Sequence, residues 1–510
     1  MAHGIVVKAK PDRPSGEMLA PIRISEVISA LSYGLDLTEG QPMGHSVRSC
    51  VIGMNIAEEI GLPVAEQGDL YYALLMKDAG CSTNASRMFQ ALGTDDIKAK
   101  RDVKTTDWTR VGWESLQYAL SHVRTGAPFL ERVRALMDLS VNHKRNARDM
   151  VQIRCERGAA IARRIGLSEA TASAIHSLDE LWDGAGHPQG LRGLQIPLLS
   201  RIMNLAQTMD VFYTAHDAKT CVQIARQRSG RWFDPSLVRA FCSLAKKSFL
   251  WSQVNSANTR VLDWEPTEET NPGQNLPNNE STLDNICLAF ADVIDAKSPF
   301  TYQHSTGVAR AAVAIGQTLA MNETEITLLR RAALLHDVGK LSVSNSILDK
   351  PGKLTESEWA AVRKHPHYSY EILKRIPNFG DLSEIAASHH EKLDGSGYFR
   401  GMTAERLSLP ARILVVADIY DALAAKRPYR DALPPDTVFG IMGKDAPHAL
   451  DPDCFDALKH AAGFGSTADL LHLAEAVMVE SAGPKPAQLV SLEAEHKHGV
   501  LSVFGDSRAA

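Results

Sequence analysis

The sequence has no paired-cysteine pattern and no long apolar run. Its seven cysteines, an odd number, are spread along the chain without any Cys-x-x-Cys spacing. A disulfide framework and a cysteine zinc site are therefore excluded, and we expect a reducing compartment. No apolar run approaches the ~20 residues of a membrane-spanning helix, and no long apolar stretch follows the charges at the N-terminus. We accordingly predict a cytoplasmic protein that has no membrane contact.

An excess of positive charge is also lacking. The chain has 55 basic and 60 acidic residues and a net charge of -5. A mildly acidic chain lacks the broad basic surface that a nucleic-acid polymer requires, so we expect any phosphate to be held locally. The content of 44% hydrophobic and 23% charged residues is that of an ordinary globular protein.

Alternation of apolar and polar residues in twos is scarce, whereas apolar residues three and four apart are common. The segments "ARAAVAIGQTLA" (309–320) and "EITLLRRAALLHDVGK" (325–340) show this spacing, which predicts helices and an all-α fold. Since single cores stop growing at roughly 250 to 300 residues, the chain should hold two domains. The stretch "WEPTEETNPGQNLPNNEST" reads as the connection between them. We therefore predict a first domain at 20–262, a linker at 263–282, a second domain at 283–480 and a tail at 481–510.

The two halves resemble each other in register. His304 and His45 lie 259 positions apart, and so do Asp337 and Asp78. Further on, "HHEKLDGSGYFRG" corresponds to "LDELWDGAGHPQG", and the offset between Asp394 and Asp183 falls to 211. The difference of 48 predicts a tandem duplication of two helical bundles, with a helical insertion near 90–145 in the first copy.

The second half gathers residues of the types that bind metals. Five imidazoles and two carboxylates on separate helical segments could hold two ions, with one carboxylate bridging them. Neighbours on a helix point ~100° apart, so adjacent ligands could address different ions. A single histidine of this kind is more often a surface or capping residue, but the whole set would leave polar groups unpaired if it were buried without an ion. The set is His304, His336, Asp337, His365, His389, His390 and Asp418.

The motifs "HDVGK", "KHP", "HHEKLDGSGYFRG", "LPARILVVADIYDAL" and "RPYR", between 284 and 460, resemble the HD-GYP family of HD-type phosphohydrolases, which hydrolyse cyclic dinucleotides. The resemblance implies a helical bundle in which the seven residues above bind two divalent ions, iron or manganese, and Asp337 bridges them. It also implies that Asp337 and Lys340 are catalytic and that Lys340 contacts the phosphate. Further substrate contacts are implied for Gly397, Tyr398, Arg427 and Arg430, the first two of which form the signature loop.

Two positions depart from the family pattern. Phe399 replaces the proline of the signature, which loosens the loop without removing a ligand. Members with a third metal carry a glutamate four residues before the first histidine, where this chain has Phe300. We therefore expect two ions.

The first half resembles a degenerate copy. Applying the offsets replaces the other ligands by Lys77, Arg154, Leu178, Asp179 and Gln207, and replaces Lys340 by Cys81. Only His45 and Asp78 remain, so we expect no two-metal site there. Lys77 and Arg154 should instead pair with the carboxylates of Asp78 and Asp179; the alternative is that these four charges reach solvent separately.

The sequence therefore predicts a cyclic di-GMP phosphodiesterase in which the second half catalyses and the first half packs against it, forms a homodimer or senses a signal. Two alternatives stay open: a preference for 3'3'-cyclic GMP-AMP, and a signalling scaffold that binds a nucleotide or partner without turnover. The complete ligand set and Lys340 favour the enzyme.

Overall fold

The computed structural model describes residues 23–107, 113–124, 128–267, 277, 279–301, 303–425 and 432–463. Regular secondary structure in these ranges is helical, and strand-like pairing is limited there to two isolated bridges, Ser229 with Phe233 and Asp394 with Thr403. The predicted all-α fold is confirmed. Among the described helices, none has the length and apolar character needed to cross a membrane.

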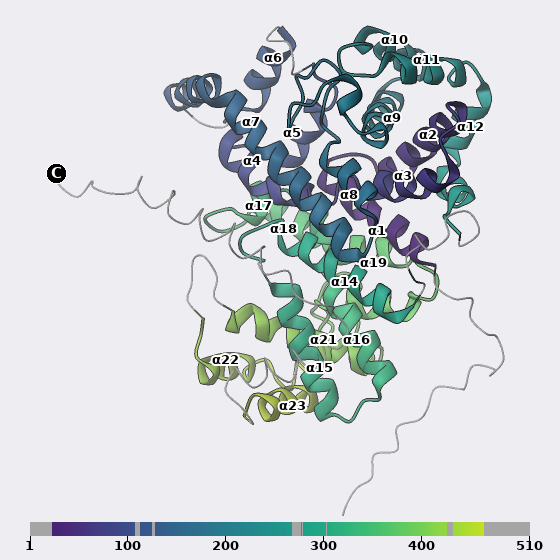
Figure 1. The fold of residues 1–510 in the computed structure, drawn as a ribbon. Helices are drawn as coiled ribbons and strands as arrows, with labels where there is room; N and C mark the ends of the chain where they lie inside the picture. The colour runs from purple at the N-terminus through teal and green to yellow at the C-terminus, as the bar shows by residue number, and fades with distance from the viewer. Residues whose placement is uncertain are drawn as a thin grey trace, which may run out of the picture.

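The first half forms the upper part of the molecule in Figure 1, coloured purple to teal. Its α-helices and 3-10 helices (η) are α1 (Ile24–Thr38), α2 (His45–Glu59), α3 (Val64–Met76), η1 (Cys81–Asn84), α4 (Ala85–Leu92), α5 (Asp96–Val103), α6 (Trp113–His122), α7 (Phe129–Ile165), α8 (Glu169–His176), η2 (Gly193–Gln195), α9 (Leu198–Ala215), α10 (Ala218–Arg228), α11 (Pro235–Leu244), α12 (Ser248–Asn255), α13 (Ala257–Arg260) and η3 (Val261–Trp264).

The second half forms the lower part, coloured teal to yellow. Its helices are α14 (Glu280–Asp295), α15 (His304–Thr318), α16 (Glu323–Leu335), η4 (Val338–Ser342), α17 (Asn345–Leu348), α18 (Glu356–Val362), α19 (His365–Leu373), α20 (Gly380–Ala387), α21 (Leu409–Ala424), α22 (Pro435–Met442) and α23 (Pro452–Gly463).

Two predicted helical segments end earlier than expected. Helix α16 begins with a capping box, in which Asn322 and Glu325 each bond the other's backbone N–H, but it ends at Leu335. His336 and Asp337 therefore lie in a turn before η4, and His389 and His390 lie in a turn after α20. The prediction that helical geometry spreads these adjacent ligands is wrong, because they extend from helix ends.

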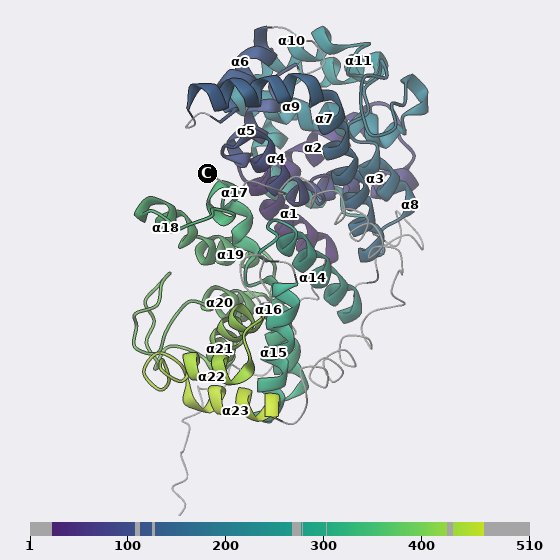
Figure 2. The ribbon, with the colours of Figure 1, turned by 90° about the vertical axis from the view of Figure 1, so that its left-hand side faces the viewer.

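The halves are packed together. Helix α1 contacts α2 and α3 of its own half and also α14, η4 and α19 of the second half. Helix α14 in turn lies against α7, and one cluster of buried apolar side chains runs through both halves. In Figures 1 and 2, α1 and α14 accordingly lie at the junction. The predicted domain boundaries stay a prediction.

The duplication reappears in hydrogen bonds away from the ligands. Asp36 accepts from the backbone N–H and hydroxyl of Ser46, and Asp295 accepts the same pair from Ser305, at the offset of 259. Within the predicted insertion, α4 to α6 and the start of α7 surround a small core cluster of their own, built on Leu92, Ala99 and Val123.

Candidate metal centre

The structure brings the seven predicted ligands together. His304 and His365 are the first residues of α15 and α19, Asp418 lies on α21, and the other four occupy the two turns described above. Six of the seven residues are buried, with 6% or less of their surface exposed. The side chain of His390 keeps 26% exposure. The centre is therefore open mainly on the side of His390.

Asp337 lies between two sets of imidazoles. Its Oδ1 is 3.4 Å from His365 Nε2 and 3.5 Å from His389 Nε2. Its Oδ2 is 3.3 Å from His336 Nε2 and 3.7 Å from His304 Nε2. Ligand atoms of His365, His389 and His390 lie within 4.8 Å of one another, and so do those of His304, His336 and Asp418. One carboxylate thus faces both sets with separate oxygens.

The histidines present free lone pairs toward this carboxylate. The Nδ1 atoms of His336, His365 and His389 each lie within 2.8 Å of the carbonyl oxygen three residues earlier, to which they donate. Their Nε2 atoms are then unprotonated in the neutral rings. His365 Nε2 and His389 Nε2 face each other at 2.9 Å, and buried His336 Nε2 and Asp337 Oδ1 have no hydrogen-bond partner. Converging unprotected lone pairs fit a bound cation, so these residues could hold metal.

The protonation states of three histidines agree with a ligand set. Burial lowers the pKa values of His365, His389 and His390 and favours their neutral rings. The pKa of His336 is raised, because the neighbouring Asp337 carboxylate outweighs the effect of burial. Burial alone would raise the pKa of Asp337, but nearby His336 and Lys340 hold it well below its usual range. His304 differs, because hydrogen bonds with Asp418 and Asp421 outweigh burial and raise its pKa to about 10.

Asp421 is a functional residue that the sequence reasoning missed. Its Oδ2 lies 2.7 Å from His304 Nδ1 and fixes the ring so that Nε2 points to the centre. Gly307 permits this approach, because an added Cβ there would lie 1.9 Å from Asp421 Oδ1. The sequence contains a signal for this residue, because the first half also has an aspartate, Asp210, at the offset of 211. In the structure Asp210 lies 2.7 Å from His45 Nδ1.

The other predicted residues border the opening. Lys340 keeps 20% exposure, and its ammonium lies 2.5 Å from Asp337 Oδ2. The backbone N–H of Tyr398 donates to His390 O at 3.1 Å, and the two rings lie 4.6 Å apart. Gly397 packs so closely that an added Cβ would lie 2.4 Å from Glu391 Cα. The predicted contacts Arg427 and Arg430 fall outside the described residues.

Phe399 takes a backbone conformation that proline cannot adopt. Its φ is 100°, whereas the proline ring fixes φ near -65°. Its ring lies 5.8 Å from His367 and 6.1 Å from Tyr370. The signature loop in this half is thus held by aromatic contacts and by buried Glu391, which accepts the backbone N–H groups of Arg400 and Met402.

The first half has charged side chains where the second half has predicted ligands. Lys77 pairs with Asp78, and Arg154 pairs with Asp179, as predicted. The insertion adds Lys104, whose ammonium lies 3.0 Å from Glu39 Oε2 and 3.9 Å from Asp78 Oδ1. The carboxylates inherited here are therefore neutralised by side-chain cations. The contribution of Lys104 was not foreseen, since it comes from a segment without a counterpart in the second half.

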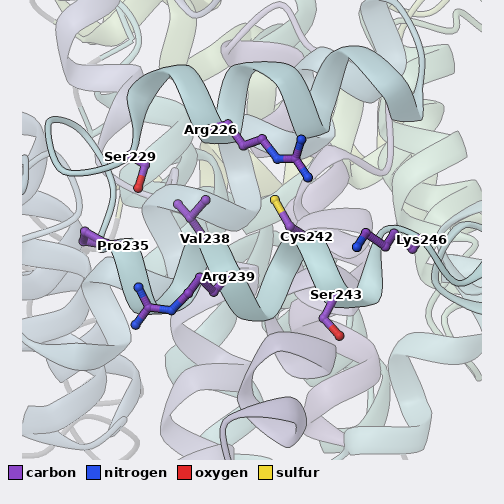
Figure 3. A pocket seen from close by; sticks show the side chains of 8 residues that line it. All are labelled: Arg226, Ser229, Pro235, Val238, Arg239, Cys242, Ser243 and Lys246. Atoms are coloured by element: carbon purple, nitrogen blue, oxygen red, sulfur yellow. The ribbon is translucent and has the colours of Figure 1, made fainter.

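A separate hollow of about 450 Å³ lies between α10 and α11 in the first half (Figure 3). It contains none of the predicted site residues and does not belong to the centre. Its lining residues are Arg226, Ser229, Pro235, Val238, Arg239, Cys242, Ser243 and Lys246.

Comparisons with known proteins agree with the geometry. The HD domain family model matches residues 135–237 and 289–454, more than half of the chain. The 3'3'-cGAMP-specific phosphodiesterase 3 of Vibrio cholerae is 43% identical over 442 residues, which cover 86% of this chain and 94% of that protein. The cyclic di-GMP phosphodiesterase response regulator RpfG of Xanthomonas campestris is 34% identical over 228 residues, 44% of this chain and 58% of that protein.

A solved structure extends the likeness to three dimensions. The crystal structure of a cyclic GMP-AMP-specific phosphodiesterase of V. cholerae aligns with a TM-score of 0.60 at 37% identity, covering 88% of this chain and all of that one. The chain belongs to the HD domain family, in its HD-GYP branch, as a tandem whose first copy is degenerate.

Proposed function

We propose that this protein is a metal-dependent phosphodiesterase that hydrolyses a cyclic dinucleotide at the centre of its second half. The observation that carries the proposal is the placement of Asp337, whose two oxygens face two separate ligand sets. Relatives that match 86% and 44% of the chain act on cyclic dinucleotides by name. The complete predicted ligand set beside Lys340 favours this activity over a scaffold without turnover.

Two divalent cations, iron or manganese, suit the donor set. His365, His389 and His390 would hold one, and His304, His336 and Asp418 the other, with Asp337 shared; mixed imidazole and carboxylate ligands are typical of such metals. Bound cations would activate water and neutralise the charge of the phosphodiester.

The chain's own groups bind and orient the substrate. Lys340 is partly exposed beside Asp337, so its ammonium can stabilise charge that builds on a phosphoryl oxygen. Tyr398 covers His390 and limits the approach to the opening. Arg427 and Arg430 stay predicted phosphate contacts.

Both candidate substrates fit this centre. Cyclic di-GMP is the substrate of several matching relatives by name, but these match only part of this chain. The relative that matches 86% of the chain, including both halves, is specific for 3'3'-cyclic GMP-AMP by name, and this coverage favours that substrate.

The test is turnover by metal-free protein after addition of manganese or iron(II). We expect linear product from 3'3'-cyclic GMP-AMP, with cyclic di-GMP measured in parallel by chromatography. Absence of linear product from both dinucleotides, in protein that has bound two metal ions per chain, would contradict the proposal.

A further inference from the structure

The opening of the centre continues into a strip of aromatic and cationic side chains. The Arg363 guanidinium carbon lies 5.8 Å from the centroid of the Tyr398 ring and 5.9 Å from that of the Trp359 ring. Tyr398 itself covers His390 at 4.6 Å, so a single aromatic ring separates Arg363 from a predicted ligand. The order along the strip is therefore His390, Tyr398, Arg363 and Trp359.

Arg363 is a cation without an anionic partner. It directly follows α18 and is exposed. In the described ranges no carboxylate pairs with it, whereas Lys350 pairs with Glu358 and Arg400 pairs with Glu384. An exposed arginine held against aromatic rings and left unpaired beside an anion-processing site is placed to receive part of the substrate.

Trp359 is a large apolar side chain that remains 42% exposed. It precedes Arg363 by one helical turn, and the backbone N–H of Arg363 donates to its carbonyl oxygen at 2.9 Å. An exposed indole offers a face on which a nucleobase can stack. At the offset of 211, the degenerate half has Arg148 and Gln152 at these positions, so the pair accompanies the complete centre only.

A cyclic dinucleotide carries two phosphodiesters, and only one can lie at the metal centre during cleavage. We propose that Arg363 binds the phosphodiester that is not being cleaved and that Trp359 stacks on a base, which makes both of them substrate-binding residues. This inference rests on the proposed function and names contacts that the motifs alone did not indicate.

Kinetics of Arg363→Gln, Arg363→Lys and Trp359→Ala in the full chain test the inference. We expect Arg363→Gln to raise KM about tenfold, since a hydrogen-bonded ion pair is lost, and to change kcat and metal content less than twofold. Arg363→Lys should restore part of the loss because it keeps the charge. The matched control is Arg239→Gln, which removes an exposed arginine at the hollow of Figure 3 and should leave KM unchanged.

Binding separates this inference from the proposed function. The affinity of metal-free protein for each dinucleotide is measured by calorimetry, with quenching of tryptophan fluorescence compared between the wild type and Trp359→Phe. Undiminished affinity and KM in both Arg363→Gln and Trp359→Ala would overturn the inference. Wild-type protein without turnover would contradict the proposed function alone, and weaker binding by Arg363→Gln would still support the contact.

Discussion

At the scale of the residue, the chemistry of the centre depends on which ring nitrogen each histidine leaves free. His336, His365 and His389 use Nδ1 to donate to a carbonyl oxygen three residues earlier, and each follows the end of a helix or turn. In the neutral rings the remaining Nε2 atoms carry no proton and converge.

The first prediction concerns the shared carboxylate. Asp337→Asn keeps the shape of the side chain but removes its charge, so both ligand sets lose their common anion. We expect metal content to fall from two ions per chain to one or fewer, and turnover to be abolished, measured by elemental analysis and by product formation. The matched control is Asp78→Asn at the equivalent position of the first half, which should leave the metal content unchanged. Two retained ions in Asp337→Asn would show that the ligand assignment is wrong.

The second prediction concerns stability of the degenerate half. Asp78 is fully buried beside Lys77 and Lys104. Asp78→Ala removes the shared partner of two buried cations, and we expect the free energy of unfolding to fall by roughly 3 to 5 kcal/mol. Denaturant unfolding measures this change. In the background of Lys77→Met the loss should be smaller, and an equal loss in both backgrounds would indicate that the pair is not coupled.

The sequence predicted residues that the structure brings together, but not all of the residues that support them. His336, Asp337 and His389 belong to motifs of consecutive residues, which can be recognised in the sequence without a structure. Asp421 and Lys104 contact residues that are distant in the sequence. These contacts become visible only in the interatomic distances of the structure. Asp421 could have been found by comparing the halves, whereas Lys104 could not, because the insertion has no counterpart.

At the scale of the element, helix ends determine the geometry. Period and composition correctly predicted the helices, but the segment 325–340 contains no proline or glycine before Gly339 to mark the end of α16 at Leu335. In the structure a turn follows the helix and places His336 and Asp337 against the other predicted ligands. Tertiary contacts therefore override a favourable local sequence, as is common for helix boundaries.

The third prediction concerns a lysine at the contact between α5 and the second half. Lys297 is 1% exposed, and its ammonium lies 3.8 Å from Asp96 Oδ2 without a hydrogen-bond partner. Burial lowers its pKa from 10.5 to about 8. Between about pH 8 and pH 10.5 the unfolded chain binds more protons than the folded one, so this group makes stability rise with pH by about 3 kcal/mol over that interval.

Thermal unfolding of the wild type and Lys297→Met from pH 7 to pH 10 checks this sign. We expect the wild type to gain stability relative to the variant as the pH rises. Lys350→Met, at a partly exposed lysine that pairs with Glu358, is the control variant. A constant difference between wild type and Lys297→Met would mean that the ammonium is not desolvated.

At the scale of the whole molecule, the degenerate half contributes to the catalytic half through a shared core. The sequence predicted two units on the basis of length and repetition, and it gave no indication that α1 packs on η4, α14 and α19. Amphipathic periodicity reports that a helix face is buried but does not report what covers it. The shared core gives a structural reason for retaining the first copy although it lacks most of the predicted ligands. A homodimer remains a further prediction for this half.

The last prediction tests that coupling at Gly34 of α1. A Cβ added there would lie 3.2 Å from Leu341 Cδ1 and 3.4 Å from Val338 Cγ2, which flank Gly339 and Lys340 in η4. Gly34→Val inserts further methyl groups into this contact, so we expect a loss of stability of about 1 to 3 kcal/mol by overpacking. We also expect a lower kcat, because displacement of η4 moves the ammonium of Lys340 relative to Asp337. Gly440→Val in α22 is the matched control, since a Cβ there meets nothing within 4 Å. Unfolding midpoints and turnover of the two variants are compared in the full chain, and equal kcat in both would show that the first half does not position Lys340.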